Sequence, residues 1–519
     1  MSQAHWEMSR RDWFAIIGAS LGAFLAILDI QITNASLKEI QGALSVDFSE
    51  GGWISTAYLM AEVVVIPLTA YLSTVFGLRN YMLINGSLFL VASTLCGFSW
   101  NIESMIFFRV LQGLTGGTLI PMSFQCMLVF MPPERKSIGL AIFGMTATLA
   151  PTLGPSLGGF LTDNFGWRWN FFMNVIPGIA MLAAMAYGLP KNSADFSKLK
   201  NMDFLGAFLM TVGLASMTYM LEDGARHDWF QSNAIKVAAL ATLVCLPTFV
   251  SVQLTKKNPL LSLTLLGQKD FALACLITMI SASALYGGIY ALSLYLGQIQ
   301  NYGAATIGQV IMWLGIPQLF IMPLVPLLMR FVDLRLLASI GLALFCFSNY
   351  LNSGLDSSFA GQEFTVSLII RAIGQPLFLI PLSAIGMAVV SPTQAGTASS
   401  IFNVLRNLGG SIGIALTGTL LLNRQAIHYQ QNLEHIGVGD FQTLERLKGL
   451  QYYLASQGQE FTGARVQGTD LLIKIAKRES AIQAFGDIFY LMAFILLICV
   501  VLVFFFKRVD ASSSMGETH

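Results

Sequence analysis

Three charged side chains stand inside stretches of sequence that are otherwise apolar. Asp29 lies in LAILDIQITNASLKEI (25–40), and Glu62 and Arg109 are likewise flanked by apolar residues on both sides. A charge inside a bilayer is costly, so such residues pair with one another or face water, and they usually mark ion or substrate paths. The two acids are therefore candidates for reversible proton binding, with the arginine as a fixed charge that tunes them.

Helix geometry brings Asp29 and Arg109 to a similar depth. At 1.5 Å per residue, Asp29 lies about 22 Å from the inner start of its apolar run, and Arg109 lies about 10 Å below the outer start of its own. We expect them to pair, directly or through water, in a cavity that opens outward. The alternative is a permanent ion pair that only holds two helices together.

The neighbours of Glu62 and Arg109 extend the polar surface along two helices. Glu62 falls near the middle of its run, and Tyr58 lies on the same helical face. A polar stripe through a membrane helix needs water or protein beside it. Gln112 continues the face of Arg109, so we expect both Tyr58 and Gln112 to line the cavity.

The second half of the chain carries two more arginines inside predicted membrane spans. Arg371 and Arg406 fall inside apolar runs, and Asn403 and Asn407 flank Arg406. No carboxylate in the same half is an evident partner. Anionic substrate groups, backbone carbonyls or Glu62 across the cavity could each serve these residues, and we expect them in the cavity lining.

Composition indicates that lipid surrounds most of the chain. Of 519 residues, 55% are hydrophobic and only 11% are charged, with a mean hydropathy of +0.66. The net charge of +1 gives no field to attract nucleic acid, and no cofactor-binding loop or metal-spaced cluster of His and Cys is evident. About fourteen runs are long enough to cross a bilayer, among them 81–100 and 204–222.

The connections between these runs predict the orientation and the domains. Lys and Arg gather in alternate connections, which places both termini in the cytoplasm. The predicted parts are a cytoplasmic N-terminus (1–13), a six-helix bundle (14–190), two additional membrane helices (191–270), a second six-helix bundle (271–506) with a long periplasmic loop (424–484), and a cytoplasmic tail (507–519).

The loop 424–484 differs from the other outer connections. It is polar and contains no span, but leucines recur in it at helical spacing, at Leu444, Leu447, Leu450 and Leu454. We expect a small helical subdomain outside the membrane or an element that docks an adaptor protein. A tolerated surface insertion is an equal alternative, because loops absorb length at little cost.

Several stretches resemble the major facilitator superfamily, and specifically its drug/proton antiporter branch of the EmrB/QacA type. The matching stretches are LDIQITNASL (28–37), RVLQG (109–113), GPSLGG (154–159), GTASSIFNVLRNLGGSIGIAL (396–416) and QAFGDIF (483–489). The third contains Gly154, Pro155, Gly158 and Gly159, a pattern that favours close helix packing and a bend, and hence a seal or pivot between the two halves.

One stretch departs from the superfamily pattern. The loop between spans 2 and 3 reads AYLSTVFGLRN (70–80), in which Ala70 replaces the usual glycine and Thr74 the usual aspartate. The family's contacts at this inner gate cannot be carried over to this chain.

The resemblance implies an all-α integral membrane protein with two six-helix bundles, two inserted helices and fourteen membrane helices in all. It implies proton-coupled export of hydrophobic or amphipathic drugs by alternating access across the bacterial cytoplasmic membrane, with no cofactor beyond the proton gradient. A periplasmic adaptor of the EmrA kind and an outer-membrane channel are the implied partners.

Two other functions remain open. One is a dedicated proton-coupled exporter of a single metabolite, such as a siderophore, a fatty acid or a pigment precursor, for which Arg371 and Arg406 would suit an anionic substrate. The other is a membrane-embedded enzyme or sensor, which would need a nucleophile and base or a soluble output domain, and neither is evident in the sequence.

Overall fold

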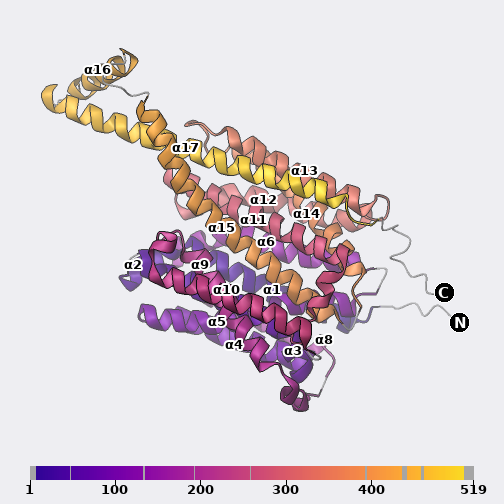
Figure 1. The fold of residues 1–519 in the computed structure, drawn as a ribbon. Coiled ribbons are helices and arrows are strands. Elements are labelled where there is room, and N and C mark those ends of the chain that lie inside the picture. The colour runs from indigo at the N-terminus through magenta and orange to yellow at the C-terminus, as the bar shows by residue number, and fades with distance from the viewer. Residues whose placement is uncertain are drawn as a thin grey trace.

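Helices make up the architecture of this chain in the computed structural model, and the described residues contain no strand (Figure 1). The structure describes residues 8–46, 48–132, 135–191, 193–256, 259–391, 394–434, 441–456 and 461–507. The predicted terminal segments 1–13 and 507–519 therefore lie largely outside the described residues, as do parts of 424–484.

The first bundle holds the N-terminal half of the chain. Its helices are α1 (Arg10–Ala35), α2 (Leu37–Leu44), α3 (Phe48–Phe76), α4 (Leu78–Gly97), α5 (Ile102–Phe130), α6 (Lys136–Phe165), α7 (Trp169–Phe172) and α8 (Val175–Gly188). The short α2 and α7 connect longer helices at the ends of the bundle. Apolar side chains on all faces suit helices that are surrounded by lipid and by one another.

Two further long helices follow the first bundle. They are α9 (Phe204–Asp223) and α10 (Asn233–Thr255), which pack against each other, and α9 also contacts α3. The outward faces of both helices carry exposed apolar side chains, such as Phe208 and Leu243. This pair matches the two inserted helices expected between the bundles.

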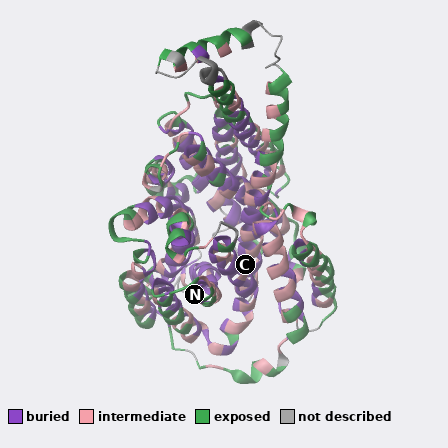
Figure 2. Ribbon diagram, turned by 90° about the vertical axis from the view of Figure 1, so that its left-hand side faces the viewer, coloured by how far each residue is buried: buried purple, intermediate pink, exposed green. Residues whose placement is uncertain are grey.

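The second bundle holds the rest of the chain. Its helices are α11 (Lys269–Gln298), α12 (Ala304–Leu328), α13 (Leu334–Leu351), α14 (Phe364–Ala388), α15 (Ala395–Glu434), α16 (Phe441–Ser456) and α17 (Phe461–Val503). Buried residues concentrate where the bundle helices meet, and exposed ones on the outer helices and the projecting end (Figure 2).

A helical hairpin projects from one end of the molecule. Helices α15 and α17 have 40 and 43 residues, or about 60 Å each, so they extend beyond a bilayer core of about 30 Å and carry α16 at their far end (Figure 1). Leu447 and Leu450 of α16 pack near Gly468 of α17, so the leucine pattern does mark a helix. We call this the hairpin side. The opposite side, where α1 begins and α17 ends, we call the terminal side.

Thirteen helices among the described residues are long and apolar enough to cross a membrane, which makes this a multi-pass membrane protein. Helix α4, the counterpart of the predicted span 81–100, is not among them, because Asn80 and Asn85 lower its mean hydropathy. The predicted count of fourteen therefore stays a prediction, as does the cytoplasmic placement of the termini.

The bundles meet along two lines. Helices α6 and α12 approach so closely that a Cβ on Gly308 would lie 2.4 Å from Ser156 Cα, and one on Gly315 would lie 2.8 Å from Thr152 Cγ2. On the terminal side, α5 and α15 meet where the Phe124 and Phe402 rings stack with centroids 5.8 Å apart. The two bundles are therefore in contact on the terminal side of the space between them.

Candidate functional site

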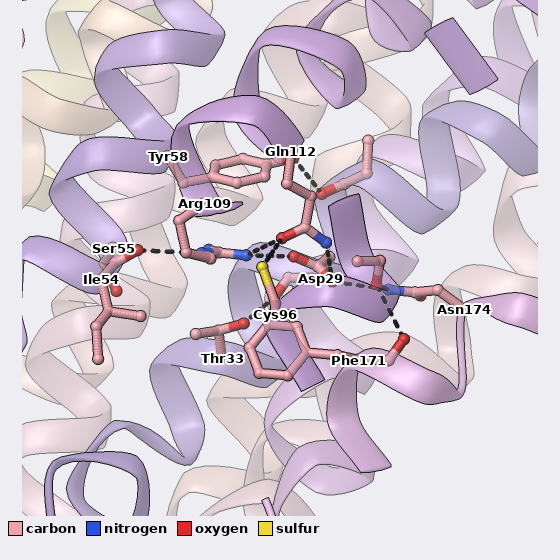
Figure 3. A network of polar contacts seen from close by, with 12 residues as sticks. Asp29, Thr33, Ile54, Ser55, Tyr58, Cys96, Arg109, Gln112, Phe171 and Asn174 are labelled. Atoms are coloured by element: carbon pink, nitrogen blue, oxygen red, sulfur yellow. Dashed lines mark hydrogen bonds and ion pairs between the residues drawn. The ribbon is translucent and has the colours of Figure 1, made fainter. Parts of the chain in front are cut away.

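A fully buried ion pair lies inside the first bundle. Arg109 Nη1 on α5 is 2.5 Å from Asp29 Oδ2 on α1, and the two side chains are 0% and 1% exposed (Figure 3). Asp29 Oδ1 accepts two more hydrogen bonds, from Gln112 Nε2 at 2.9 Å and from Asn174 Nδ2 at 2.7 Å. Three charge-assisted bonds and an opposite charge compensate this carboxylate for the loss of water.

Arg109 is held by α3 as well. Its Nε donates to the carbonyl oxygen of Ile54 at 3.0 Å, and its guanidinium lies over the Tyr58 ring, 4.3 Å from the centroid (Figure 3). The Tyr58 hydroxyl donates to the carbonyl oxygen of Ala26 at 3.2 Å. Three helices are thereby joined through one arginine, by hydrogen bonds and by a cation–π contact.

The sequence prediction for this group is right about the contact and wrong about its surroundings. Asp29 and Arg109 do meet, but their side chains are sealed from the cavity instead of facing an opening. Tyr58 and Gln112, expected in the cavity lining, are both 0% exposed and belong to this network. In this conformation the geometry matches the alternative of an ion pair that holds helices together.

Asn174 is a member of this network that the sequence analysis did not identify. It precedes α8, donates to Asp29 and also donates to Ser93 Oγ at 3.0 Å. An asparagine directly before an apolar helix is common at helix ends, so its type alone does not indicate a functional role. The one hint in the sequence is its position near a predicted membrane boundary.

Glu62 lies in a different environment, at a cavity between the two bundles. Its side chain on α3 is 2% exposed, and Oε1 accepts a hydrogen bond of 2.9 Å from Asn407 Nδ2 on α15. Within the described chain, Glu62 Oε2 has no hydrogen-bond partner. A buried carboxylate oxygen that is left unbonded is destabilising, so this acid is ready to take a proton or a ligand.

The cavity has an empty volume of about 650 Å³ and draws its walls from both bundles and from α9. Most of the lining is apolar, and its polar members include Glu62, Arg406 and Asn407 as expected. The lining residues are Ile27, Ile30, Gln31, Asn34, Leu59, Glu62, Val63, Ile120, Glu222, Tyr286, Arg406, Asn407, Gly410, Ser411 and Ile414.

Glycines on α5 set the position of Glu62. A Cβ on Gly117 would lie 2.9 Å from both Cα and Cγ of Glu62, and one on Gly113 would lie 2.4 Å from the carbonyl oxygen of Tyr58. Only residues without a side chain permit so close an approach of α3 and α5. The glycine of RVLQG therefore acts in packing, next to the residues that carry charge.

Glu222 is a second carboxylate in the cavity lining that the sequence analysis missed. It is the last residue of the predicted span 204–222, where an acid reads as a boundary residue in contact with water. The structure continues α9 through Asp223 and places Glu222 in the cavity, half-buried. Its depth depends on how α9 packs against the bundles, which hydropathy alone does not show.

Arg371 and Asn403 do not lie in this cavity, contrary to expectation. Arg371 is 2% exposed, donates from Nη2 to the carbonyl oxygen of Leu285 at 2.7 Å and lies over the Phe345 ring at 4.9 Å. Asn403 donates to the carbonyl oxygen of Ser399 within its own helix. A backbone carbonyl, one of the partners considered above, thus serves Arg371.

The GPSLGG stretch packs mainly inside the first bundle. A Cβ on Gly154 would lie 2.3 Å from Gln31 Cβ, and one on Gly158 would lie 2.9 Å from the carbonyl oxygen of Ile32, both on α1. Pro155 and Gly159 are buried in the same helix, α6. The other face of α6, with Thr152 and Ser156, meets the second bundle. The expected close packing is present, but these glycines do not themselves form the seam between the halves.

Comparison with known proteins decides the family. The family model of the Major Facilitator Superfamily matches residues 19–414. The chain belongs to this superfamily. The transporter is 34% identical to the colistin resistance protein EmrB of Acinetobacter baumannii, over 98% of each chain. It is 30% identical to the multidrug export protein EmrB of Escherichia coli, over 95% of this chain and 94% of that one.

A further relative and two solved structures complete the comparison. The fatty acid resistance protein FarB of Neisseria gonorrhoeae is 30% identical over 81% of this chain and 83% of its own. Two solved structures share the fold. One is the human organic anion transporter MFSD10, with a TM-score of 0.56 and 15% identity over 93% of this chain and 99% of that one. The other is the proton:xylose symporter XylE, with a TM-score of 0.58 and 12% identity over 97% of this chain and 98% of that one. The transporter is thus of the EmrB type, which confirms the branch predicted from its motifs.

Proposed function

We propose that the transporter exports hydrophobic or amphipathic drugs and other toxic compounds across the bacterial cytoplasmic membrane in exchange for protons. The EmrB proteins that match nearly its full length are named for multidrug export and colistin resistance, which supports the substrate class. The proton gradient supplies the energy without a bound cofactor. The observation that carries the coupling is the half-bonded carboxylate of Glu62 at the cavity between the bundles.

Glu62 is the residue that we propose to exchange the proton during alternating access. Its two oxygens differ, since one is bonded to Asn407 of the opposite bundle and the other lacks a partner in the described part of the chain. A proton on Glu62 removes a charge that faces α15, so protonation alters a contact between the bundles. Because the affinity for the proton differs between two conformations, proton binding shifts their populations.

Asp29 and Arg109 take a supporting role in this scheme. Both carboxylate oxygens already accept hydrogen bonds, from Arg109, Gln112 and Asn174, so in this conformation a proton would compete with these donors. We propose that the pair fixes α1, α3 and α5 as one unit, so that the first bundle moves as a rigid body around Glu62.

Proteoliposomes containing the purified transporter test the coupling. Substrate-driven proton movement would be followed with a pH-sensitive dye for wild type, Glu62→Gln and Asp29→Asn, with Glu39→Gln on the exposed face of α2 as the matched control. We expect Glu62→Gln to abolish proton movement and Glu39→Gln to leave it unchanged. Unchanged proton movement in Glu62→Gln would contradict the proposal, and its loss in Asp29→Asn alone would assign the coupling proton to Asp29 instead.

A dedicated exporter of one anionic metabolite has less support. Of the two arginines that suggested it, only Arg406 lines the cavity, while Arg371 is engaged with a backbone carbonyl. Uptake by inverted vesicles separates the two functions. Transport of several unrelated compounds supports drug export, whereas transport of a single anion supports the dedicated exporter.

The projecting hairpin is the proposed docking element for a periplasmic adaptor, which would connect the transporter to an outer-membrane channel. At its base, Asn432 Nδ2 donates to Ser480 Oγ at 2.9 Å, so α15 and α17 run side by side there. Residues 433–479 can therefore be replaced by a short Gly/Ser linker. We expect transport in liposomes to persist and export from cells to fall. Equal losses in both assays would argue against docking.

A further inference from the structure

The cavity contains a feature that the proton scheme does not use, namely a second acid. Glu62 comes from α3 of the first bundle, and Glu222 comes from α9, one of the two inserted helices. Between them the walls are mainly apolar, with Ile30, Ile120 and Tyr286 among the lining residues. The inserted helices are therefore more than a lipid-facing addition, because α9 supplies a charged group to the central space.

Several contacts fix α9 at the edge of this cavity. The rings of Trp53 on α3 and Tyr219 on α9 stack with centroids 5.2 Å apart. Arg226 crosses α3 at Gly52, where a Cβ would lie 1.6 Å from its Nη1. Beyond α9, Trp229 Nε1 donates to Thr419 Oγ1 of α15 at 2.9 Å. Glu222 is thus held between the two bundles by contacts with both.

The charges around Glu222 leave the cavity with an excess of negative charge. Next to Glu222 in the chain, Asp223 at the end of α9 and Arg226 just beyond it form an ion pair of 3.0 Å and offset each other. From the other walls, Glu62 of α3 and Arg406 of α15 also line the space. With both acids ionised, two carboxylates and one guanidinium leave one negative charge.

Hydrogen bonding within the site is incomplete on both acids. Glu62 Oε2 and Glu222 Oε1 are buried atoms without a hydrogen-bond partner in the described ranges. The Glu62 side chain is only 2% exposed, and it lines the same cavity. A buried carboxylate oxygen without a hydrogen bond is destabilising next to apolar walls. An organic cation with an apolar body would give such an oxygen a charged partner and would cover the apolar walls.

We propose that Glu222 is a substrate-binding residue that makes this cavity a site for monovalent organic cations with an apolar body. Glu222 holds the charged centre, the isoleucines and Tyr286 cover the body, and Glu62 stays available for the proton. The proposal rests on the exporter function and adds to it the charge of the preferred substrate and the residue that selects it.

Two ions of nearly the same shape and opposite charge test this directly. Binding of tetraphenylphosphonium and tetraphenylborate to the purified, detergent-solubilised transporter would be measured by competition with a fluorescent drug. We expect wild type to bind the phosphonium at least about tenfold more tightly than the borate, as for an ion pair in a site that excludes water.

Three variants assign that preference. We expect Glu222→Gln to reduce the preference to within about threefold, and Glu222→Asp and the surface control Glu39→Gln to preserve it. Retained binding of a neutral drug shows that Glu222→Gln is folded. If that variant does not fold, the wild-type preference and the Glu222→Asp result still decide. An equal affinity of wild type for both ions, or an undiminished preference in Glu222→Gln, overturns the proposal.

The measurement also separates this inference from the exporter function. Equilibrium binding needs no gradient, so it reports on the cavity alone. If the wild-type transporter showed no proton-coupled transport in liposomes but still preferred the phosphonium, the export function would be contradicted and the cation site supported. If it transported neutral drugs with proton coupling but showed no preference between the two ions, the export function would be supported and the cation site contradicted.

Discussion

Asp29 and Glu62 are both acids deep in membrane helices of the same bundle, yet their environments differ in kind. Asp29 has a counter-charge, two amide donors and no access to the cavity. Glu62 has one amide donor from the opposite bundle, an unbonded oxygen and a cavity beside it. The two acids are equally buried, so burial alone does not separate them. We propose that the number of unsatisfied atoms, and the bundle from which the partners come, separate a structural acid from a proton carrier.

The largest effect is expected from removing the counter-charge of Asp29. Arg109→Ala leaves that carboxylate buried without its ion-pair partner, which typically costs about 3–5 kcal/mol. We expect a large loss of thermal stability in detergent, measured by unfolding monitored with a thiol-reactive dye. The surface change Arg330→Ala is the matched control and should alter stability by less than about 0.5 kcal/mol.

A double variant sharpens this test. Arg109→Gln with Asp29→Asn removes both charges and should be more stable than Arg109→Gln alone, because no unpaired charge remains in the bundle. If the double variant were the less stable of the two, the pair would not be acting through its charges.

An intermediate effect is expected from crowding Glu62. Gly117→Ala places a Cβ 2.9 Å from Cα and Cγ of Glu62, so α3 must shift, at a cost of about 1–3 kcal/mol. Gly144→Ala on α6 is the control, since its Cβ would meet nothing closer than 3.5 Å. We expect only Gly117→Ala to reduce both stability and proton movement. Equal behaviour of the two variants would show that the approach of α5 does not set the position of Glu62.

The smallest effect is expected at Asp203, an acid that directly precedes α9 and lies outside its membrane-spanning part. Burial raises its pKa, but hydrogen bonds from Lys256, the Gly206 backbone and Gln253 outweigh this and hold the pKa below its ordinary value of 3.8. Because the folded-state pKa is lowered, the stabilisation is present above the ordinary value and is lost as the pH falls through the folded-state pKa.

The measurement at Asp203 is therefore a pH series of thermal unfolding. We expect Asp203→Asn to lower stability at neutral pH by about 1 kcal/mol, since Lys256 is half-exposed and its charge is screened by solvent. The difference between wild type and variant should shrink below about pH 4. A difference that stays constant down to pH 3 would show that the charge of Asp203 does not contribute.

The sequence analysis predicted correctly how deep these side chains lie in the membrane, but not which of them line the cavity. Helical rise converts residue number into position along the membrane normal, and on that basis Asp29 and Arg109 were correctly expected to meet. Whether a side chain faces a cavity depends on how helices far apart in sequence pack, so Tyr58 and Gln112 were expected in the lining and lie in the sealed network. Glu222 was missed for the same reason, because its surroundings come from α3 and α15.

The closeness of α6 and α12 makes this contact the natural pivot for the proposed alternating access. At Gly308 the backbone of α12 meets the backbone of Ser156, and at Gly315 it meets the side chain of Thr152, so the two helices cannot approach more closely along that line. If the proposed alternating access turns the halves about this close contact, displacement grows with distance from the rotation axis. The wall made of α3, α9 and α15 would then travel furthest, and the hydrogen bond from Trp229 to Thr419 lies across the gap that such a turn would widen.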